Sequence, residues 1–423
     1  MIKSVSKALI LGALLSATAN ALAADVLIKN TRIIDGAEAR TSQLIEILIK
    51  GKKIAAIGAG LQVSNDTQII DANGRPLSSG LFNADTQLGL LEVGAVSDTV
   101  DGSSDNERIT ASLRVSDAFN ASSVAIPYNR SLGITHSLIQ PTSGAGLFAG
   151  TASVVKLSDT DSIIMEQAAM VVSLGEAGSE LAGGSRAAAM AQLREAMEDA
   201  RDYANNKSRF NSGDRRQYAL SRHDLEALVP VIKGRLPLLV KVHRAADIER
   251  IIAFAKEQKV KLILSGVAEG WRVAKQIAEA NIPVIFDPIN NLPGSYESLG
   301  HRLDNAKLLH EAGVKIIFTG MGWQNTHNAY LVRQSAGNAV ANGLPYNIAI
   351  QAITSTPAQV FGLSGYGQIK VGAEATLILW SGDPLEVSSN PDLVMIQGQQ
   401  YSLESRATRL RDRYYERLQK VAK

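Results

Sequence analysis

Short runs of alternating hydrophobic and polar residues follow residue 24 and return near the other end of the chain. VLIKNTRII, IEILIKGKKIAAIG and TQIIDANG are separated by Gly, Asn and Asp residues. ATLILWSG and LVMIQGQQYS repeat the pattern, with GDPLE between them. Period-two alternation bounded by turn residues is typical of β-strands. The pattern therefore predicts a small β-sandwich domain built from both chain ends, residues 24–78 and 364–403.

The middle of the chain changes to a strand-then-helix rhythm. Apolar runs such as LPLLVKVH, VKLILSG, IPVIFDP and VKIIFTG alternate with segments whose apolar residues lie three and four positions apart. Repeated βα units of this kind form parallel sheets. An eight-stranded βα barrel needs about 250 residues, so we expect an α/β fold with a TIM-like (β/α)8 barrel over residues 79–363.

Two charged segments are expected to form helices outside the barrel, residues 184–205 and 404–423. In the second, ESRATRLRDRYYERLQKVAK, acidic residues are interleaved with the basic ones. Interleaved charge favours a solvated or subunit-contacting helix over a nucleic-acid-binding arm. A homo-oligomer is therefore one arrangement to consider, and no nucleic-acid partner is expected.

The first 23 residues have the three parts of an export signal. Lys3 and Lys7 give a positive start, ALILGALLSA is an apolar stretch too short to span a bilayer, and ALA at 21–23 is a cleavage site. We expect a Sec-type signal peptide, a periplasmic location and no membrane span in the mature chain. Removing its two lysines lowers the formal charge from +2 to 0, which leaves no basic excess for nucleic acid.

Cysteine is absent, so thiol catalysis, disulfides and cysteine-bound zinc are excluded. The glycine-containing segments GAGLQVSNDT and GGSRAA lack the context of a phosphate loop or a dinucleotide fingerprint. Function must therefore be sought at the ends of the barrel strands.

Several stretches of the chain resemble the amidohydrolase superfamily, in particular its imidazolonepropionase-like and prolidase-like secreted branch. IIDANGRPLSSGLFNADTQLGL resembles the family's entry to the first barrel strand, KVHRAADI its fifth strand and VKIIFTG its eighth. PAQVFGLSGYGQIKVGAEATLILWSGDPLE, with its string of glycine turns, is the most specific match. The resemblance implies a hydrolase of non-peptide C–N bonds, in amides or cyclic amides, or of dipeptide-like bonds, that uses a metal-bound water.

The resemblance also implies where the metal ligands should lie, and most of these positions hold other residues. Two histidines are expected at i and i+2 on strand one, where side chains share a face, but Asp85 and Gln87 stand there. The strand-five histidine is retained as His243, whereas Gly266 and Gly320 replace a strand-six histidine and a strand-eight aspartate. Glycines and an amide cannot hold Zn²⁺ as imidazoles and a carboxylate do. We expect a degenerate active site with either one divalent metal ion, such as zinc, or none.

If a metal binds, the candidate ligands are His243, Asp85 and Lys241. Lys241 lies two residues before His243 and is either a carboxylated bridge or an ion-paired lysine at a strand end. The candidate catalytic residues are Asp85, His243 and Asp287. Asp287 ends the seventh strand and serves either as an acid or base or as a turn-stabilising aspartate.

Three further side chains, Gln87, His136 and His327, are candidate substrate contacts. His136 in GITHSLIQP is either a substrate contact on strand two or a buried core histidine. His327 in GWQNTHNAY follows strand eight and is either a substrate contact or part of a helix start. Glu269 is expected at the positive end of a helix. The other histidines are expected at the surface: His223, His301 and His310.

Two kinds of function stay open on the sequence. The first is an amidohydrolase with a reduced or relocated metal site, or a metal-free variant that uses Asp85, Asp287 and a histidine. The second is a catalytically inactive barrel that binds a small molecule or peptide, or that pairs with a complete, related hydrolase. Fold resemblance alone does not decide between them, because function lies in the site and not in the fold.

Overall fold

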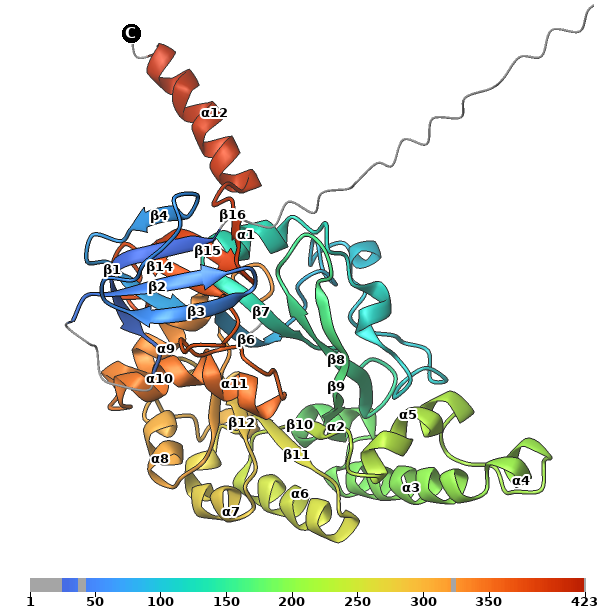
Figure 1. Cartoon of the computed structure of the whole chain (residues 1–423). Helices are drawn as coiled ribbons and strands as arrows, with labels where there is room; N and C mark the ends of the chain where they lie inside the picture. Colours follow the sequence, from blue (N-terminus) through green and yellow to red (C-terminus); the bar gives the residue numbers. More distant parts are fainter. Residues whose placement is uncertain (1–24, 37–42, 321–324, 422–423) are drawn as a thin grey trace, which may run out of the picture.

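The structure is a computed structural model, and it describes residues 25–36, 43–320 and 325–421. The predicted signal peptide lies outside these residues. Two eight-stranded sheets organise the chain. The one built from the middle of the chain, the larger of the two, contains the longest strand and is surrounded by helices (Figure 1). Among the described residues, no helix combines the length and the apolar character needed to cross a membrane.

The larger sheet curves into a barrel and takes its strands from the middle of the chain. Its strands follow each other in sequence order, and the first and last also lie against each other. The expected α/β barrel is therefore confirmed. The strands are β6 (Leu81–Thr86), β7 (Ile134–Ile139), β8 (Phe148–Lys156), β9 (Ile163–Ser173), β10 (Leu238–Val242), β11 (Leu262–Gly266), β12 (Val284–Phe286) and β13 (Ile316–Phe318).

One barrel strand departs from the expected βα repeat. β8 pairs antiparallel with both β7 and β9, whereas the other hydrogen-bonded neighbours in the barrel are parallel. The connections on either side of β8, residues 140–147 and 157–162, contain no helix. A strand buried on both faces is a continuous apolar run in either orientation, so FAGTASVVK gave no sign of the reversal.

Helices cover the outside of the barrel, and four of them lie between β9 and β10. The helices are α1 (Ala125–Ser131), α2 (Gly175–Leu181), α3 (Arg186–Asn205), α4 (Lys207–Asn211), α5 (Arg222–Ile232), α6 (Ala245–Gln258), α7 (Ala274–Glu279), α8 (Asn305–Glu311), α9 (Val332–Ala341), α10 (Tyr346–Ala352) and α11 (Ser355–Val360). Short 3₁₀ turns are η1 (Ser97–Thr99), η2 (Val115–Ala118), η3 (Gly270–Arg272), η4 (Tyr296–Ser298) and η6 (Ala329–Leu331).

The longest of these helices, α3, begins where its sequence predicts. The Ser185 side chain accepts hydrogen bonds from the N–H groups of Ala187 and Ala188, which are free at a helix start. The buried residues recur three and four positions apart and pack against the barrel side, among them Ala189, Leu193, Ala196 and Ala200.

The smaller sheet joins the two ends of the chain, as the alternating pattern predicted. β5 pairs with β1 on one side and with β14 on the other, so Leu77 lies opposite Leu379. Trp380 is fully buried and donates from Nε1 to Ser78 Oγ at 2.8 Å. The strands are β1 (Val26–Ile34), β2 (Ile45–Lys50), β3 (Lys53–Gly58), β4 (Gln68–Asp71), β5 (Pro76–Ser79), β14 (Leu377–Trp380), β15 (Pro391–Ile396) and β16 (Gln399–Tyr401). Beyond them, helix α12 (Arg406–Val421) projects from the body (Figure 1).

Apolar side chains fill the inside of the barrel near the start of the parallel strands. The rings of Phe82 and Phe361 stack there with their centroids 6.0 Å apart. The interior is therefore closed at this end, which leaves the carboxyl ends of the strands, the barrel mouth, as the place for a site. The other members of this core include Leu138, Leu239, Ile263, Ile285, Ile317 and Tyr366.

Candidate functional site

Asp85 and Lys241 lie at the carboxyl ends of β6 and β10 and approach each other at the barrel mouth. Asp85 Oδ2 is 3.9 Å from Lys241 Nζ, and the side chains are 33% and 28% exposed. β6 and β10 are not neighbours in the sheet, so the two side chains meet over the barrel interior. In the structure Lys241 is the counter-ion of Asp85, which is one of the two roles the sequence left open.

A buried amide network holds the backbone at Asp85. Asn83 Nδ2 donates to Asn325 Oδ1 at 2.7 Å, and Thr319 Oγ1 donates to Asn83 Oδ1 at 2.9 Å. The Asn325 side chain also donates to the Asp85 carbonyl. These contacts join the end of β6 to the segment after β13. Sequence reasoning missed Asn83, although it lies two residues before Asp85 and the alternation of strand side chains was the available signal.

Gln87 lies just beyond the end of β6. Its backbone N–H donates to Thr326 Oγ1 at 3.0 Å. A Cβ atom added to Gly102 would lie 2.3 Å from Gln87 Nε2, so the Gln87 side chain packs tightly against the loop that follows β6. Asp85 therefore contacts Lys241 across the mouth, whereas Gln87 contacts the loop at the rim of the mouth.

His243 follows β10 and lies half-buried beside a second histidine. Burial is the main cause that lowers its pKa; Lys241 lowers the pKa further and Glu176 raises it. Its Nδ1 is buried and has no hydrogen-bond partner among the described residues. The centroid of the His301 ring lies 6.1 Å from that of His243, with the two rings perpendicular. The candidate site thus contains a neutral imidazole that is free to bond.

The prediction that His301 lies at the surface is wrong. The segment after β12 folds back over the strand ends, where Trp271 Nε1 donates to the Gly300 carbonyl at 2.9 Å. His301 Nδ1 is buried and also has no partner in the described part of the chain. Burial is the main cause that lowers the pKa of His301, and repulsion between the two rings when both are protonated lowers it further. Nothing in the local sequence indicated this, because the fold of a long loop brings the two histidines together.

Gly266 and Gly320 stand at two of the positions where the resemblance implies ligands, and neighbouring atoms fill the space beside them. Gly266 has φ +92°, and a Cβ atom on it would lie 2.6 Å from His243 Cε1. A Cβ atom on Gly320 would lie 2.9 Å from Ser335 Oγ. Because Cβ atoms do not approach other atoms this closely, a larger side chain at either position requires its neighbours to move. Met321, the next residue, lies outside the described residues.

Asp287 lies after β12 in a turn. Its Oδ1 accepts from the Ile289 N–H at 3.1 Å and from Ser335 Oγ at 2.9 Å. These bonds give Asp287 the turn-stabilising role that the sequence offered as an alternative to catalysis.

Glu269 interacts with a different helix from the one that follows it. Its Oε2 accepts from the N–H of Ala245, the first residue of α6, at 2.9 Å. The carboxylate therefore lies at the positive end of α6.

His136 and His327, two of the three expected substrate contacts, lie in contrasting places. His136 is 1% exposed and lies opposite Phe82 near the start of the strands, with its ring centroid 4.0 Å from that of Tyr366. Burial, with a smaller contribution from Lys156, lowers its pKa from 6.5 to about 3. The structure thus places His136 in the core and away from the mouth. His327 is exposed in the turn before η6.

The residues described at the mouth do not fit the metal centre that the resemblance implies. Asp85 is paired with Lys241, and His243 faces Gly266 and His301. Within residues 25–36, 43–320 and 325–421, no group of three or more His, Asp or Glu side chains is placed to hold a metal ion.

Comparison with known proteins agrees with this fold. Residues 196–401 match the model of the family described as "Amidohydrolase family". The amidohydrolase tasK of Hapsidospora irregularis is 23% identical over 372 residues, which cover 80% of this chain and 37% of that protein. The chain thus spans little more than a third of the length of that curated relative.

Two solved structures show the shared architecture. An amidohydrolase from Thermotoga maritima superposes with a TM-score of 0.79 at 23% identity, over 89% of this chain and 99% of that one. A prolidase complexed with N-methylphosphonate-L-proline gives a TM-score of 0.52 at 14% identity, over 89% and 99% of the two chains. Residues 196–401 are therefore similar to the amidohydrolase family, and the solved structures share the fold over most of the chain.

Proposed function

We propose that the protein binds a small ligand at its barrel mouth, without the metal centre of the superfamily's hydrolases, and that the ligand belongs to the dipeptides or N-acyl amino acids. The Asp85–Lys241 pair carries this proposal. The pair is 3.9 Å long and about a third exposed, so each charge is still open to a ligand. Lys241 offers a cation for a carboxylate, and Asp85 offers an acceptor for an amide or ammonium N–H.

The packing around the two glycines supports the absence of the metal centre. The His243 ring and Ser335 Oγ lie where side chains at Gly266 and Gly320 would stand. Polar groups of His243 and Ser335 in these two places are suited to hydrogen bonding with an organic ligand. The prolidase of similar fold was solved with N-methylphosphonate-L-proline, which is the reason to begin with dipeptide-like compounds.

A second candidate function is hydrolysis of an amide or dipeptide-like bond with one weakly held divalent ion. The observation that favours it is that the buried Nδ1 atoms of His243 and His301 have no hydrogen-bond partner among the described residues, and that the two ring centroids are 6.1 Å apart. Neutral imidazoles are common metal ligands, and they also act as general bases.

We further propose that the chain belongs to the prolidase-like secreted branch and acts in the periplasm, on the basis of the export signal at 1–23. A complete, related hydrolase is a candidate partner, because a barrel that binds the same ligands without metal is suited to a non-catalytic subunit.

Isothermal titration of residues 24–423 with N-acyl amino acids, hydantoins and dipeptides tests the binding function, together with elemental analysis of protein purified without chelators. We expect less than stoichiometric metal, and binding that Lys241→Gln weakens about tenfold through the loss of one charged hydrogen bond. Lys261→Gln is the matched control, because Lys261 precedes β11 at the opposite end of the barrel.

Two results would decide against ligand binding without metal. Stoichiometric zinc that is lost in His243→Ala together with turnover establishes the second candidate instead. Equal affinities for Lys241→Gln and the unaltered chain, or no binding by any class of compound, remove the Asp85–Lys241 pair from any role in recognition.

A further inference from the structure

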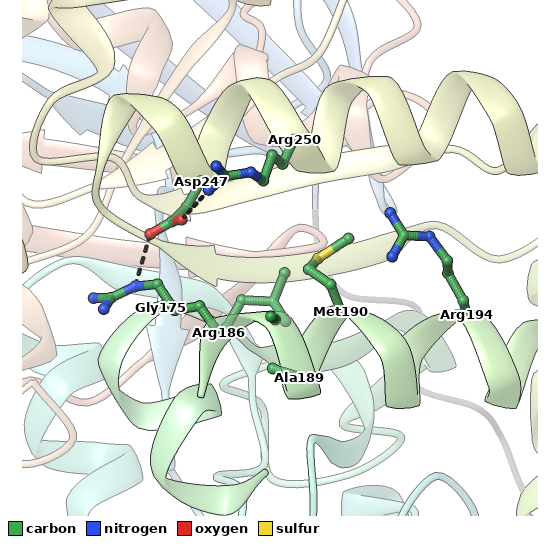
Figure 2. A pocket seen from close by; sticks show the side chains of 9 residues that line it. Gly175, Arg186, Ala189, Met190, Arg194, Asp247 and Arg250 are labelled. Atoms are coloured by element: carbon green, nitrogen blue, oxygen red, sulfur yellow. Dashed lines mark hydrogen bonds and ion pairs between the residues drawn. The ribbon is translucent and has the colours of Figure 1, made fainter. Parts of the chain in front are cut away.

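A cavity of about 340 Å³ lies between helices α3 and α6 (Figure 2). It is lined from α3 by Met190 and Arg194 and from α6 by Arg250, and the mouth residues Asp85 and Lys241 do not line it. Its size is at the small end of the range for ligand pockets, about 300 to 1,000 Å³. The cavity is therefore a candidate binding site separate from the mouth.

The charges around this cavity do not balance. The Asp247 carboxylate accepts from Arg186 at 3.0 Å and from Arg250 at 3.4 Å, and it lies 3.7 Å from Arg244. Arg250 remains 62% exposed. The Arg194 side chain is exposed and makes no hydrogen bond or ion pair with another described residue. One carboxylate thus serves three guanidinium groups, while a fourth has no partner among the described residues.

Two further acidic residues reduce the excess of positive charge, but only beside Arg186. Arg186 also donates to Glu297 at 3.2 Å and lies 3.9 Å from Glu176, so its charge is neutralised there. The Arg194 side chain is left without an acidic partner among the described residues, and Arg250, which donates to Asp247, is still exposed to a ligand. Guanidinium groups bind carboxylates through paired hydrogen bonds, which makes an organic acid a suitable ligand.

The floor of the cavity is apolar. Leu174 and Ala189 are buried at 5% and 2% exposure, and Met190 lies between Arg186 and Arg194 along α3 (Figure 2). Methionine adapts its shape to ligands of different form. A fully hydrated anion gains nothing from such a floor, whereas an anion with an apolar chain does.

We propose that this cavity binds a small aliphatic carboxylate, with Arg194 holding the carboxylate group, Arg250 adding a second positive charge to the lining and Met190 contacting the chain. The site is independent of the function proposed for the mouth. Its ligand class follows from the exposed guanidinium group of Arg194, unpaired among the described residues, beside an apolar floor.

Titration of residues 24–423 with hexanoate, butanoate, hexan-1-ol and inorganic phosphate tests the proposal. We expect hexanoate to bind more tightly than the other three, with up to about fourfold gained per added methylene from butanoate to hexanoate. Arg194→Gln is expected to weaken hexanoate binding about tenfold. Arg244→Gln is the matched control, because Arg244 approaches the same Asp247 without lining the cavity.

The mouth could also attract a carboxylate, and one variant separates the two sites. Lys241→Gln is expected to leave the hexanoate affinity unchanged. The proposal is overturned if Lys241→Gln abolishes binding while Arg194→Gln does not. It is equally overturned if Arg244→Gln weakens binding as much as Arg194→Gln, or if hexan-1-ol or phosphate binds as tightly as hexanoate.

Discussion

His136 is a titratable side chain whose protonation state is fixed by burial. Its ring contacts Tyr366 in the barrel core, and its Nδ1 lies 3.1 Å from Thr135 Oγ1. Protonation in this apolar site would place a charge where water cannot reach it. The folded chain therefore keeps His136 neutral at pH values where an unfolded chain protonates it.

This difference predicts a loss of stability in acid. The pKa of His136 is lowered from 6.5 to about 3, so below pH 6.5 the unfolded chain binds a proton that the folded chain does not. The contribution of His136 is fully present above pH 6.5 and is lost as the pH falls towards 3. We expect its share of the free energy of unfolding to fall by roughly 2 kcal/mol between pH 8 and pH 5.

Urea unfolding of His136→Gln and of the unaltered chain across this pH range measures that share. The variant should have the weaker pH dependence. His223→Gln, a change at an exposed histidine, serves as the control and should keep the full dependence. Identical slopes for all three proteins would show that His136 does not contribute.

The sequence predicted the position of a side chain well where that position depends on a single strand. Asp85 and Lys241 were both expected at strand ends, and both lie there. Their pairing, and the position of His301 beside His243, depend on contacts between distant segments. Local periodicity contains no information about such contacts, which is why His301 was expected at the surface.

Helix α5 is attached to the long loop after β6 by one buried carboxylate. Asp224 is fully buried, and its Oδ1 accepts from the N–H groups of Thr110 and Ser112 at 3.0 and 2.7 Å. Its Oδ2 accepts from Ser221 Oγ at 2.8 Å at the start of the same helix. One side chain therefore both holds the capping residue of the helix, Ser221, and orders the loop after β6.

We expect Asp224→Ala to lower the free energy of unfolding by about 3 kcal/mol, because it leaves two backbone N–H groups without acceptors. Glu226→Ala on the same helix is the comparison, since Glu226 is 52% exposed and pairs with Lys207 at the surface. That change should cost less than about 1 kcal/mol. Denaturant unfolding of both variants measures the difference, and similar costs would contradict the role of Asp224.

At the level of elements, the sequence predicted whether a segment forms a helix or a strand more reliably than it predicted whether a strand runs parallel or antiparallel to its neighbours. The four strands from β10 to β13 and the helices between them occur where the apolar runs placed them. The antiparallel orientation of β8 was not foreseen, because a buried strand has the same composition in both directions.

The whole molecule depends on strands from both chain ends. β5 lies between β1 and β14, and Trp380 from the C-terminal part donates to Ser78 from the N-terminal part. Helix α12, in contrast, projects from the body (Figure 1), with Tyr414, Tyr415 and Leu418 exposed. The two C-terminal parts should therefore differ in their importance for stability.

Two truncations test this difference. A chain that ends at Ser405 lacks only α12, and we expect its unfolding temperature to change by less than about 2 °C. A chain that ends at Leu363 loses β14 to β16 and should fail to give a cooperative transition, since β5 and Leu77 lose their partners. Circular dichroism melts distinguish the outcomes, and a cooperative melt of the shorter chain would show that the barrel folds without the second sheet.

The union of the two chain ends in one sheet also means that this sheet cannot be completed until nearly the whole chain has been synthesised. Ser79 and Leu377 are paired, so about 300 residues separate the two strands, and synthesis at ~5 to 20 residues per second takes roughly 15 to 60 s to cover them. Throughout that interval the edge of β5 is without its partner, and unpaired strand edges promote aggregation. A chaperone that shields the emerging N-terminal strands would raise the yield of folded protein more than it would raise the stability of the finished molecule.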